Sequence, residues 1–339
     1  MKKLSLALGA AMMLCACAAF AADKKPEDYK GTVMLYSSCD EGVQLKLKAA
    51  FEKKYPNVTM EYYFAGSGKV ATKLSTELQT KAVACDVIFL ASPDFYINWK
   101  NEGSLVTYKS PFAAAIPASL KDADDTYAAA YVILMGFGYS TVTCSLEEAP
   151  KTYKELTDPK WQGQFVMPDP NTAGSTKAAV WALVNDKRYG WDYFKALKAN
   201  EVGLESSTGN AENRVVSAAF KAGLGCDYRM LNLVANGTPI GFNNTQDVIC
   251  TCPCPIAIPK GCPNEELAKL LFDWLLDPKG GQYVMAQECN LTVANADTEL
   301  PAGRLKSTEV DAIAIPVDWN EMVKGAPEML AKFDAMFKN

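Results

Sequence analysis

Strand-length apolar runs alternate with helical patterns between residues 31 and 91, and this alternation limits the folds open to the chain. The apolar runs cover residues 33–36, 58–64 and 87–90. Between the last two, Val70, Leu74 and Leu78 recur at the spacing i, i+4, i+8, which is typical of one face of a helix. Strands that alternate with helices pair in parallel. The sequence therefore predicts an α/β fold.

Each of these apolar runs is followed by a polar turn. Ser37 and Ser38 follow the first run, residues 65–69 (Ala-Gly-Ser-Gly-Lys) follow the second, and Ser92 follows the third. Ligands of open α/β sheets bind outside the carboxyl ends of the strands. These turns are therefore the first candidates for a binding site.

The first 21 residues are interpreted as a secretory signal. A basic start at Lys2 and Lys3 precedes an apolar stretch over residues 4–18, and residues 19–21 supply small side chains at the spacing of a signal-peptidase site. Residues 14–17 also resemble a lipobox, in which Cys17 would carry the lipid. The sequence predicts a periplasmic protein, and it leaves open release or a lipid anchor at Cys17.

The charge balance and the lack of histidine exclude several functions. The chain has a net charge of −5, and loss of a leader with two lysines and no acid gives −5 − 2 = −7. This acidic excess argues against nucleic acid and anionic membranes as partners. Without histidine a Ser-His-Asp triad is excluded, and the commonest general base is missing. We expect no cofactor.

Nine cysteines remain after the leader, an odd number. They are residues 39, 85, 144, 226, 250, 252, 254, 262 and 289. Cys250, Cys252 and Cys254 would share one face of a strand, and with Cys262 they would give four soft ligands for zinc or copper. The spacing lacks the CxxC pairs of common zinc sites. We therefore favour buried thiols or disulfides over a metal site.

The second half continues the α/β alternation. Strand-like runs cover residues 131–134, 136–140, 165–167 and 255–258, and helical patterns cover residues 175–184, 190–199, 211–222 and 264–276. A second turn, residues 171–177 (Asn-Thr-Ala-Gly-Ser-Thr-Lys), precedes one of these helices just as residues 65–69 precede another. Glycines let a ligand approach the backbone, and helix starts favour an anion. Tyr63 and Val70 rule out a nucleotide P-loop at the first turn. The two turns would face each other across a cleft, or Ser67 and Ser175 would merely cap their helices.

Seven short segments, taken in their order along the chain, carry a family resemblance. They are residues 35–38 (Leu-Tyr-Ser-Ser), 51–56 (Phe-Glu-Lys-Lys-Tyr-Pro), 65–68 (Ala-Gly-Ser-Gly), 156–163 (Leu-Thr-Asp-Pro-Lys-Trp-Gln-Gly), 167–170 (Met-Pro-Asp-Pro), 255–258 (Pro-Ile-Ala-Ile) and 268–273 (Ala-Lys-Leu-Leu-Phe-Asp). With these segments the chain resembles the periplasmic solute-binding proteins of ABC importers, in the branch that contains ferric-ion, 2-aminoethylphosphonate, hexose-phosphate and thiamine binders. The resemblance covers nearly the whole mature chain.

The resemblance implies a type II periplasmic-binding-protein fold, with two α/β lobes joined by crossover hinge strands. It places residues 30–112 and 248–298 in lobe 1, and residues 113–247 and 299–339 in lobe 2. It also implies a monomer that passes a small solute to an ABC permease and its ATPase in the inner membrane.

The ligand is the open question. Ferric-ion members typically carry a Tyr-Tyr pair, and the comparable place here has Asp227 followed by the single tyrosine Tyr228. The serine-rich turns favour a small anionic solute, an organophosphate or phosphonate, with Asp227 and Tyr228 reading its organic part. Ferric ion or thiamine is the alternative. A structural role, in which Asp227 and Tyr228 only support a hinge or a strand end, also stays open.

An exported hydrolase is the competing class, with Ser67 and Lys69 or Ser175 and Lys177 as nucleophile and base. Neighbouring residues at a helix start point in different directions, so we expect a binding protein and no enzyme. The predicted ligand-binding residues are Ser37, Ser38, Ser67, Gly68, Lys69, Ser92, Thr172, Ser175, Thr176, Asp227 and Tyr228.

Overall fold

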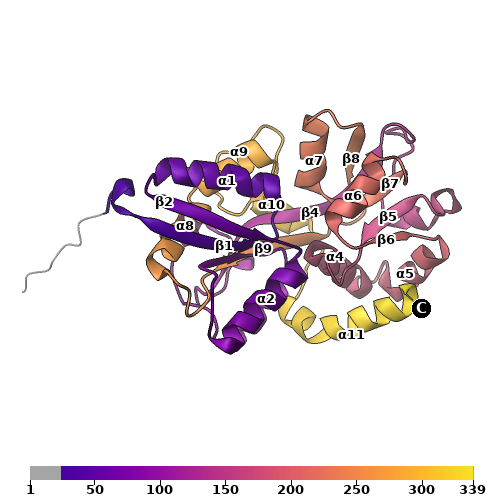
Figure 1. Ribbon diagram of the computed structural model, residues 1–339. Helices are drawn as coiled ribbons and strands as arrows, with labels where there is room; N and C mark the ends of the chain where they lie inside the picture. Colours follow the sequence, from indigo (N-terminus) through magenta and orange to yellow (C-terminus); the bar gives the residue numbers. More distant parts are fainter. Residues whose placement is uncertain (1–23, 339) are drawn as a thin grey trace, which may run out of the picture.

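The structure, a computed structural model, describes residues 24–338 (Figure 1). The predicted signal and Cys17 lie outside these residues. The strands are β1 (Gly31–Ser37), β2 (Val58–Phe64), β3 (Val87–Phe89), β4 (Ala128–Ser140), β5 (Phe165–Pro168), β6 (Gly203–Glu205), β7 (Ala222–Cys226), β8 (Ile240–Asn244), β9 (Thr251–Ala257) and β10 (Thr292–Val293). The α-helices are α1 (Glu41–Lys54), α2 (Ser67–Thr80), α3 (Pro93–Asn101), α4 (Gly174–Asn185), α5 (Gly190–Ala199), α6 (Thr208–Val216), α7 (Asp227–Ala235), α8 (Glu265–Leu276), α9 (Gly281–Cys289), α10 (Ser307–Ile313) and α11 (Trp319–Phe337).

The strands form one sheet in the order β2-β1-β3-β9-β4-β7-β5-β6, with β8 and β10 also paired to β4. We call β1, β2, β3 and β9 with helices α1–α3, α8 and α9 the first lobe, and β5–β8 with helices α4–α7 the second lobe. Strand β4 pairs with β9 of the first lobe and with β7 and β8 of the second (Figure 1). The two lobes are therefore parts of one sheet.

Pairing within the lobes is parallel where the sequence predicts it. Strand β1 pairs in parallel with β2 and β3, and β5 pairs in parallel with β6 and β7. The antiparallel pairs involve β9 and β4, which run between the lobes. This mixture of parallel lobes and antiparallel crossovers is the expected α/β architecture.

Strand β4 is the centre of the core. All 13 of its residues are buried, and it packs between β9 and the strands of the second lobe. Its partner β9 carries Pro253 and Pro255, which have no N–H to donate to a sheet. The register of β4 shifts between Ala129 and Tyr131, opposite Pro255 and Cys254, so a bulge accommodates this part of β9.

Two sequence-based assignments were wrong in detail. The runs 131–134 and 136–140 are one strand, β4, because Met135 pairs with Cys226 without a break. The helix expected over residues 211–222 ends at Val216. Ala218 has a φ of 56°, in the left-handed region that ends helices, and Ala222 begins β7.

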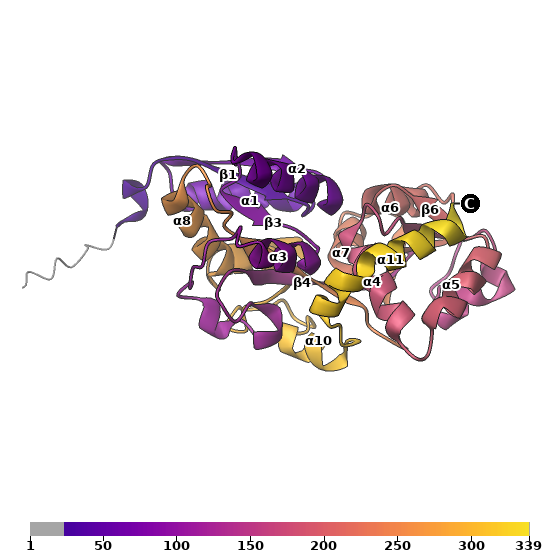
Figure 2. The ribbon, with the colours of Figure 1, turned by 90° about the horizontal axis from the view of Figure 1, so that it is seen from below.

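The C-terminal helix α11 bridges the two lobes. It packs on α3 of the first lobe and on α4 and α5 of the second (Figure 2). Phe333 on α11 is fully buried against Phe194 of α5. The residues at which the chain passes from lobe to lobe stay a prediction. No helix within residues 24–338 is long and apolar enough to cross a membrane.

Candidate functional site

The turn after β1 separates its two serines. Ser37 is fully buried, and its hydroxyl accepts hydrogen bonds from the Cys39 N–H at 3.0 Å and from the Gln44 side-chain amide. It therefore holds the start of α1. Ser38 is half-buried, and its hydroxyl oxygen accepts from the Ala91 N–H at 3.1 Å and from the Ser67 hydroxyl at 2.9 Å. A hydroxyl has two acceptor sites and one proton, so Ser38 keeps its proton for a further acceptor.

The start of α2 adds backbone donors beside Ser38. Gly66 is the N-cap, and none of the described side chains caps this helix, although Ser67 reaches Ser38. The first N–H groups of a helix have no partner within it, and the helix dipole makes this end positive. Gly68 belongs to this turn and is half-buried, while the side chain of Lys69 is exposed.

The start of α4 lies against the start of α2. A Cβ on Gly174 would be 2.0 Å from the carbonyl oxygen of Ala91 and 3.1 Å from the Ser67 hydroxyl. The carbonyl oxygen of Thr172 lies 3.2 Å from the Cβ position of Gly66. The two glycine turns therefore touch across the lobes, and we call this arrangement the closed form.

The polar side chains of the α4 turn have different roles. The Thr172 hydroxyl donates to the Asp169 carbonyl at 3.1 Å and so stabilises the turn itself. The Ser175 hydroxyl lies 3.5 Å from the sulfur of Cys226. The Thr176 side chain is fully buried, and its hydroxyl has no hydrogen-bond partner among residues 24–338. Unpaired buried hydroxyls are costly, so Thr176 is a candidate donor for a ligand.

A buried ion pair closes this part of the interface. Lys177 of α4 contacts Asp94 of α3 at 2.7 Å, and both side chains are less than a tenth exposed. The Ser92 hydroxyl donates to the other oxygen of Asp94 at 2.7 Å, and the Lys177 ammonium lies 4.4 Å from the ring centre of Phe95. Ser92 therefore serves the ion pair.

Asp227 and Tyr228 lie at the junction of α7 with β4. The Asp227 carboxylate accepts from the Leu134 N–H at 3.2 Å and from Arg304 at 3.1 Å. Burial raises the pKa of Asp227, and the charge of Arg304 opposes that rise. Tyr228 is buried with its ring 5.9 Å from Tyr131, and burial raises its pKa well above the usual value. Asp227 is thus occupied with holding the second lobe to β4.

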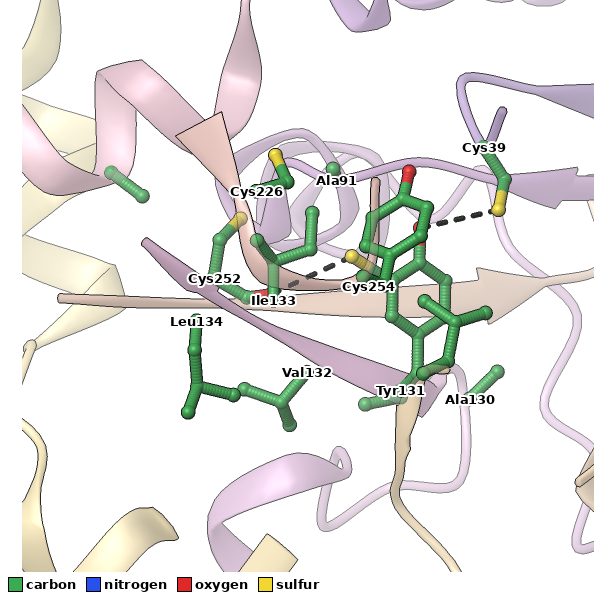
Figure 3. Close-up of a cluster of buried hydrophobic side chains, with 14 of the residues drawn as sticks. Cys39, Ala91, Ala130, Tyr131, Val132, Ile133, Leu134, Cys226, Cys252 and Cys254 are labelled. Atoms are coloured by element: carbon green, nitrogen blue, oxygen red, sulfur yellow. Dashed lines mark hydrogen bonds between the residues drawn. The ribbon is translucent and has the colours of Figure 1, made fainter. Parts of the chain in front are cut away.

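Thiols lie among aromatic and aliphatic side chains in the buried core (Figure 3). The Tyr131 hydroxyl donates to the sulfur of Cys39 at 3.3 Å, and the Cys254 thiol lies 3.5 Å from the Cys252 carbonyl. Eight of the nine cysteines in the described chain are buried, and none of the nine forms a disulfide there. No group of three or more Cys, Asp or Glu side chains within residues 24–338 is placed to hold a metal.

A surface hollow lies elsewhere. It has a volume of about 520 Å³ and is lined by the end of α4 and by the segment that leads into α11, including Trp181, Arg188 and Ile315. None of the eleven predicted site residues lines it. The chemistry of the helix starts therefore locates the candidate site at the interface of the lobes.

Comparison with known proteins identifies the family. Residues 84–324 match the model of the bacterial extracellular solute-binding protein family. This chain belongs to that family. An uncharacterised protein of Haemophilus influenzae is 25% identical over 337 residues, which cover 91% of this chain and 92% of the relative.

Solved structures share the fold of this solute-binding protein. The periplasmic binding protein AfuA of Actinobacillus pleuropneumoniae, with fructose-6-phosphate bound, aligns with a TM-score of 0.79 and 22% identity over 91% of this chain and 99% of AfuA. Iron-bound HitA of Pseudomonas aeruginosa aligns with a TM-score of 0.75 and 15% identity over 89% and 99%. The type II periplasmic-binding-protein fold is confirmed.

Three charged residues of this solute-binding protein were not on the list of predicted site residues. Lys177, Asp94 and Arg229 all make contacts between the lobes. All three residues lie near the starts of helices that follow strands. Those helix starts meet at the carboxyl ends of the strands, where ligands of α/β sheets bind, so their place in the sequence could have indicated these residues. Their pairing across the lobes depends on tertiary structure and left no local pattern.

Proposed function

We propose that this solute-binding protein captures a small organophosphate or phosphonate between the starts of α2 and α4 and delivers it to an ABC permease and its ATPase. The proposal rests above all on the Ser38 hydroxyl. Both of its acceptor sites are engaged, by Ala91 and Ser67, so its proton is directed to another acceptor. A phosphoryl oxygen is such an acceptor, and a ferric ion is not.

Further donors support an anion at the same place. The first amides of α2 and α4 favour negative charge, and Thr176 offers an unpaired buried hydroxyl. Ser67 acts through Ser38, because its own proton is donated to the Ser38 oxygen. In the closed form Gly174 leaves no room between its backbone and Ala91, so the phosphoryl group binds beside this contact, and the lobes open to admit it.

Ferric ion is the competing ligand, since HitA is iron-bound. Hard Fe(III) favours phenolate and carboxylate oxygens. The Asp227 carboxylate is already bound to Arg304 and to the Leu134 amide, which leaves Tyr228 without an obvious partner ligand at that place. AfuA, which has fructose-6-phosphate bound, supports the proposed phosphoryl ligand.

A thermal-shift panel tests the proposal. It holds glucose 6-phosphate, fructose 6-phosphate, 2-aminoethylphosphonate, inorganic phosphate, thiamine and ferric citrate. A ligand at 100 times its Kd stabilises the fold by about 2.7 kcal/mol, which is easily seen. Ser38→Ala should weaken binding about 10- to 100-fold, because a hydrogen bond to a charged group contributes about 1.5–3 kcal/mol.

Ser37→Ala is the matched control, since Ser37 is the neighbouring serine whose hydroxyl serves α1. It should lower the melting temperature without changing the relative affinity for the anion. A shift with ferric citrate alone, abolished by Tyr228→Phe and untouched by Ser38→Ala, would replace the proposal with iron binding.

A further inference from the structure

Arg229 lies where three turns of the two lobes meet. It is on the first turn of α7, its guanidinium contacts Asp40 in the turn after β1, and its Nη2 atom lies 3.4 Å from the Cβ position of Gly209 on α6. These turns follow β7, β1 and β6. Arg229 therefore reaches the carboxyl ends of strands from both lobes.

The two carboxylates that contact Arg229 differ in their exposure to solvent. Its Nε and Nη2 atoms donate to the carboxylate of Glu212, a buried side chain, with contacts of 2.8 Å. Its Nη1 atom donates to Asp40, whose side chain is 35% exposed. Burial alone would lower the pKa of Arg229, but Glu212 and Asp40 outweigh it, and the guanidinium stays charged. Glu212 already neutralises the charge, and Asp40 is a second carboxylate that is open to solvent.

Asp40 is also close to the proposed anion site. It lies two residues after Ser38, and consecutive Cα atoms are about 3.8 Å apart, so its Cα is within about 7.6 Å of that of Ser38. Arginine binds phosphoryl groups through a planar fork of donors. The Nη1 atom of Arg229 is a donor of that kind, and Asp40 occupies it.

We propose that Arg229 is the cationic contact of the bound anion, and that Asp40 competes with the anion for its Nη1 atom. The ligand displaces Asp40 from Nη1 and leaves the Glu212 pair intact. This inference rests on the proposed function, and it adds a specificity-determining residue and an internal competitor to the site. The alternative is a latch, in which Asp40 and Arg229 simply hold the lobes together.

Substitution of Asp40 separates the two interpretations by sign. Asp40 is the N-cap of α1, and its side chain accepts from the Gly42 N–H at 2.9 Å. Asparagine caps a helix as well as aspartate does, so Asp40→Asn removes the charge and keeps the cap. An internal competitor predicts tighter binding of glucose 6-phosphate and 2-aminoethylphosphonate by about two- to fivefold, as expected for a partly exposed ion pair. A latch predicts weaker binding.

Two controls complete the experiment. Glu41→Gln removes a charge from the adjacent exposed residue, which has no contact with Arg229 among those of the described residues. It should leave the affinity unchanged, and an equal gain with Glu41→Gln would mean a general field effect and overturn the proposal. Arg229→Met combined with Glu212→Gln removes both members of the buried pair and should weaken binding at least tenfold. Arg229→Lys keeps the charge without the fork and should weaken it less.

The outcomes are measured by isothermal titration at fixed ionic strength, with circular dichroism to verify folding. Unchanged or weaker binding by Asp40→Asn overturns the inference and leaves the proposed function intact. If neither probe binds the wild-type protein, the proposed function fails first, and the inference falls with it.

Discussion

The turns that begin α2 and α4 have similar sequences and opposite environments. Both place glycine, serine and lysine at a helix start. In the α2 turn Lys69 is exposed and Ser67 is bonded within its own lobe. In the α4 turn Lys177 is buried against Asp94, and Gly174 is packed on the backbone of the other lobe. The local motif thus determines the geometry of the backbone amides at each helix start. The tertiary contacts determine which of the two turns packs against the other lobe.

The lysines should give the largest difference between the turns. Lys177→Met leaves the buried Asp94 carboxylate without its cation, and breaking a buried pair from one side costs about 3–5 kcal/mol. We expect the closed form to be lost, with a larger radius of gyration by X-ray scattering and ligand affinity reduced at least 100-fold. Lys69→Met, at the matching position, should stay within about 0.5 kcal/mol of wild type. Equal effects of the two variants would refute the contrast.

The glycines should give the next largest difference. A Cβ at position 174 would lie 2.0 Å from the Ala91 carbonyl oxygen, whereas one at position 68 would lie 3.4 Å from the nearest atom, the Asn171 carbonyl oxygen. Gly174→Ala should therefore destabilise the closed form by about 1–3 kcal/mol, as overpacking does. Ligand titration should show this as a 10- to 100-fold loss of affinity. Gly68→Ala is the control. Normal affinity in Gly174→Ala would show that this contact is absent when ligand is bound.

Loss of the Thr176 hydroxyl and loss of the Ser67 hydroxyl should differ by about 1 kcal/mol in their effect on the free energy of unfolding. The Thr176 hydroxyl is unpaired in the described chain, so Thr176→Val should leave the free energy of unfolding unchanged or raise it, and should weaken the anion complex. Ser67→Ala removes a made hydrogen bond, so it should lower the free energy of unfolding by about 1 kcal/mol. Urea denaturation with and without ligand distinguishes these patterns, and a stability loss in Thr176→Val without a binding loss would contradict them.

Lowering the pH should destabilise the α4 turn more than the α2 turn. This is the smallest of the differences predicted between the two turns. Burial tends to raise the pKa of Asp169, but Lys338 and the amides of Asn171 outweigh it and lower the pKa. Its contribution is present above the usual aspartate pKa of about 3.9 and is lost as the pH falls through the lower folded value. Asp169→Asn should flatten the fall of stability between about pH 5 and pH 3. The α2 turn has no carboxylate among residues 65–69. Identical pH profiles of the two proteins would exclude this role for Asp169.

The elements with strong local signals could be predicted from the sequence. The periodicity of Val70 and Leu74 gave α2, and the glycine turns marked both helix starts. The helix that ends at Val216 was predicted too long, because Ala218 adopts a left-handed conformation that alanine seldom shows. The continuity of β4 was missed, because its partners β7, β8 and β9 come much later in the chain.

The candidate site could be predicted from the sequence only in part, for the same reason. Sequence identified the serine turns but could not tell Ser37, which is turned inward, from Ser38, whose proton is directed to a further acceptor. Asp227 has a carboxylate suited to a ligand, yet Arg304 from near the C-terminus binds it. Such pairings join residues that are far apart in sequence, and no local pattern records them.

The shared strand β4 has a consequence for the order in which the protein is made. Residues 128–140 leave the ribosome early, whereas β7 begins at Ala222 and β9 at Thr251. At roughly 5–20 residues per second, the 110 residues between Ser140 and Thr251 take on the order of ten seconds to synthesise. During that interval a 13-residue segment that is buried throughout in the folded protein has neither neighbour available. Nascent chains should therefore need a chaperone that shields β4 until residue 257 has emerged.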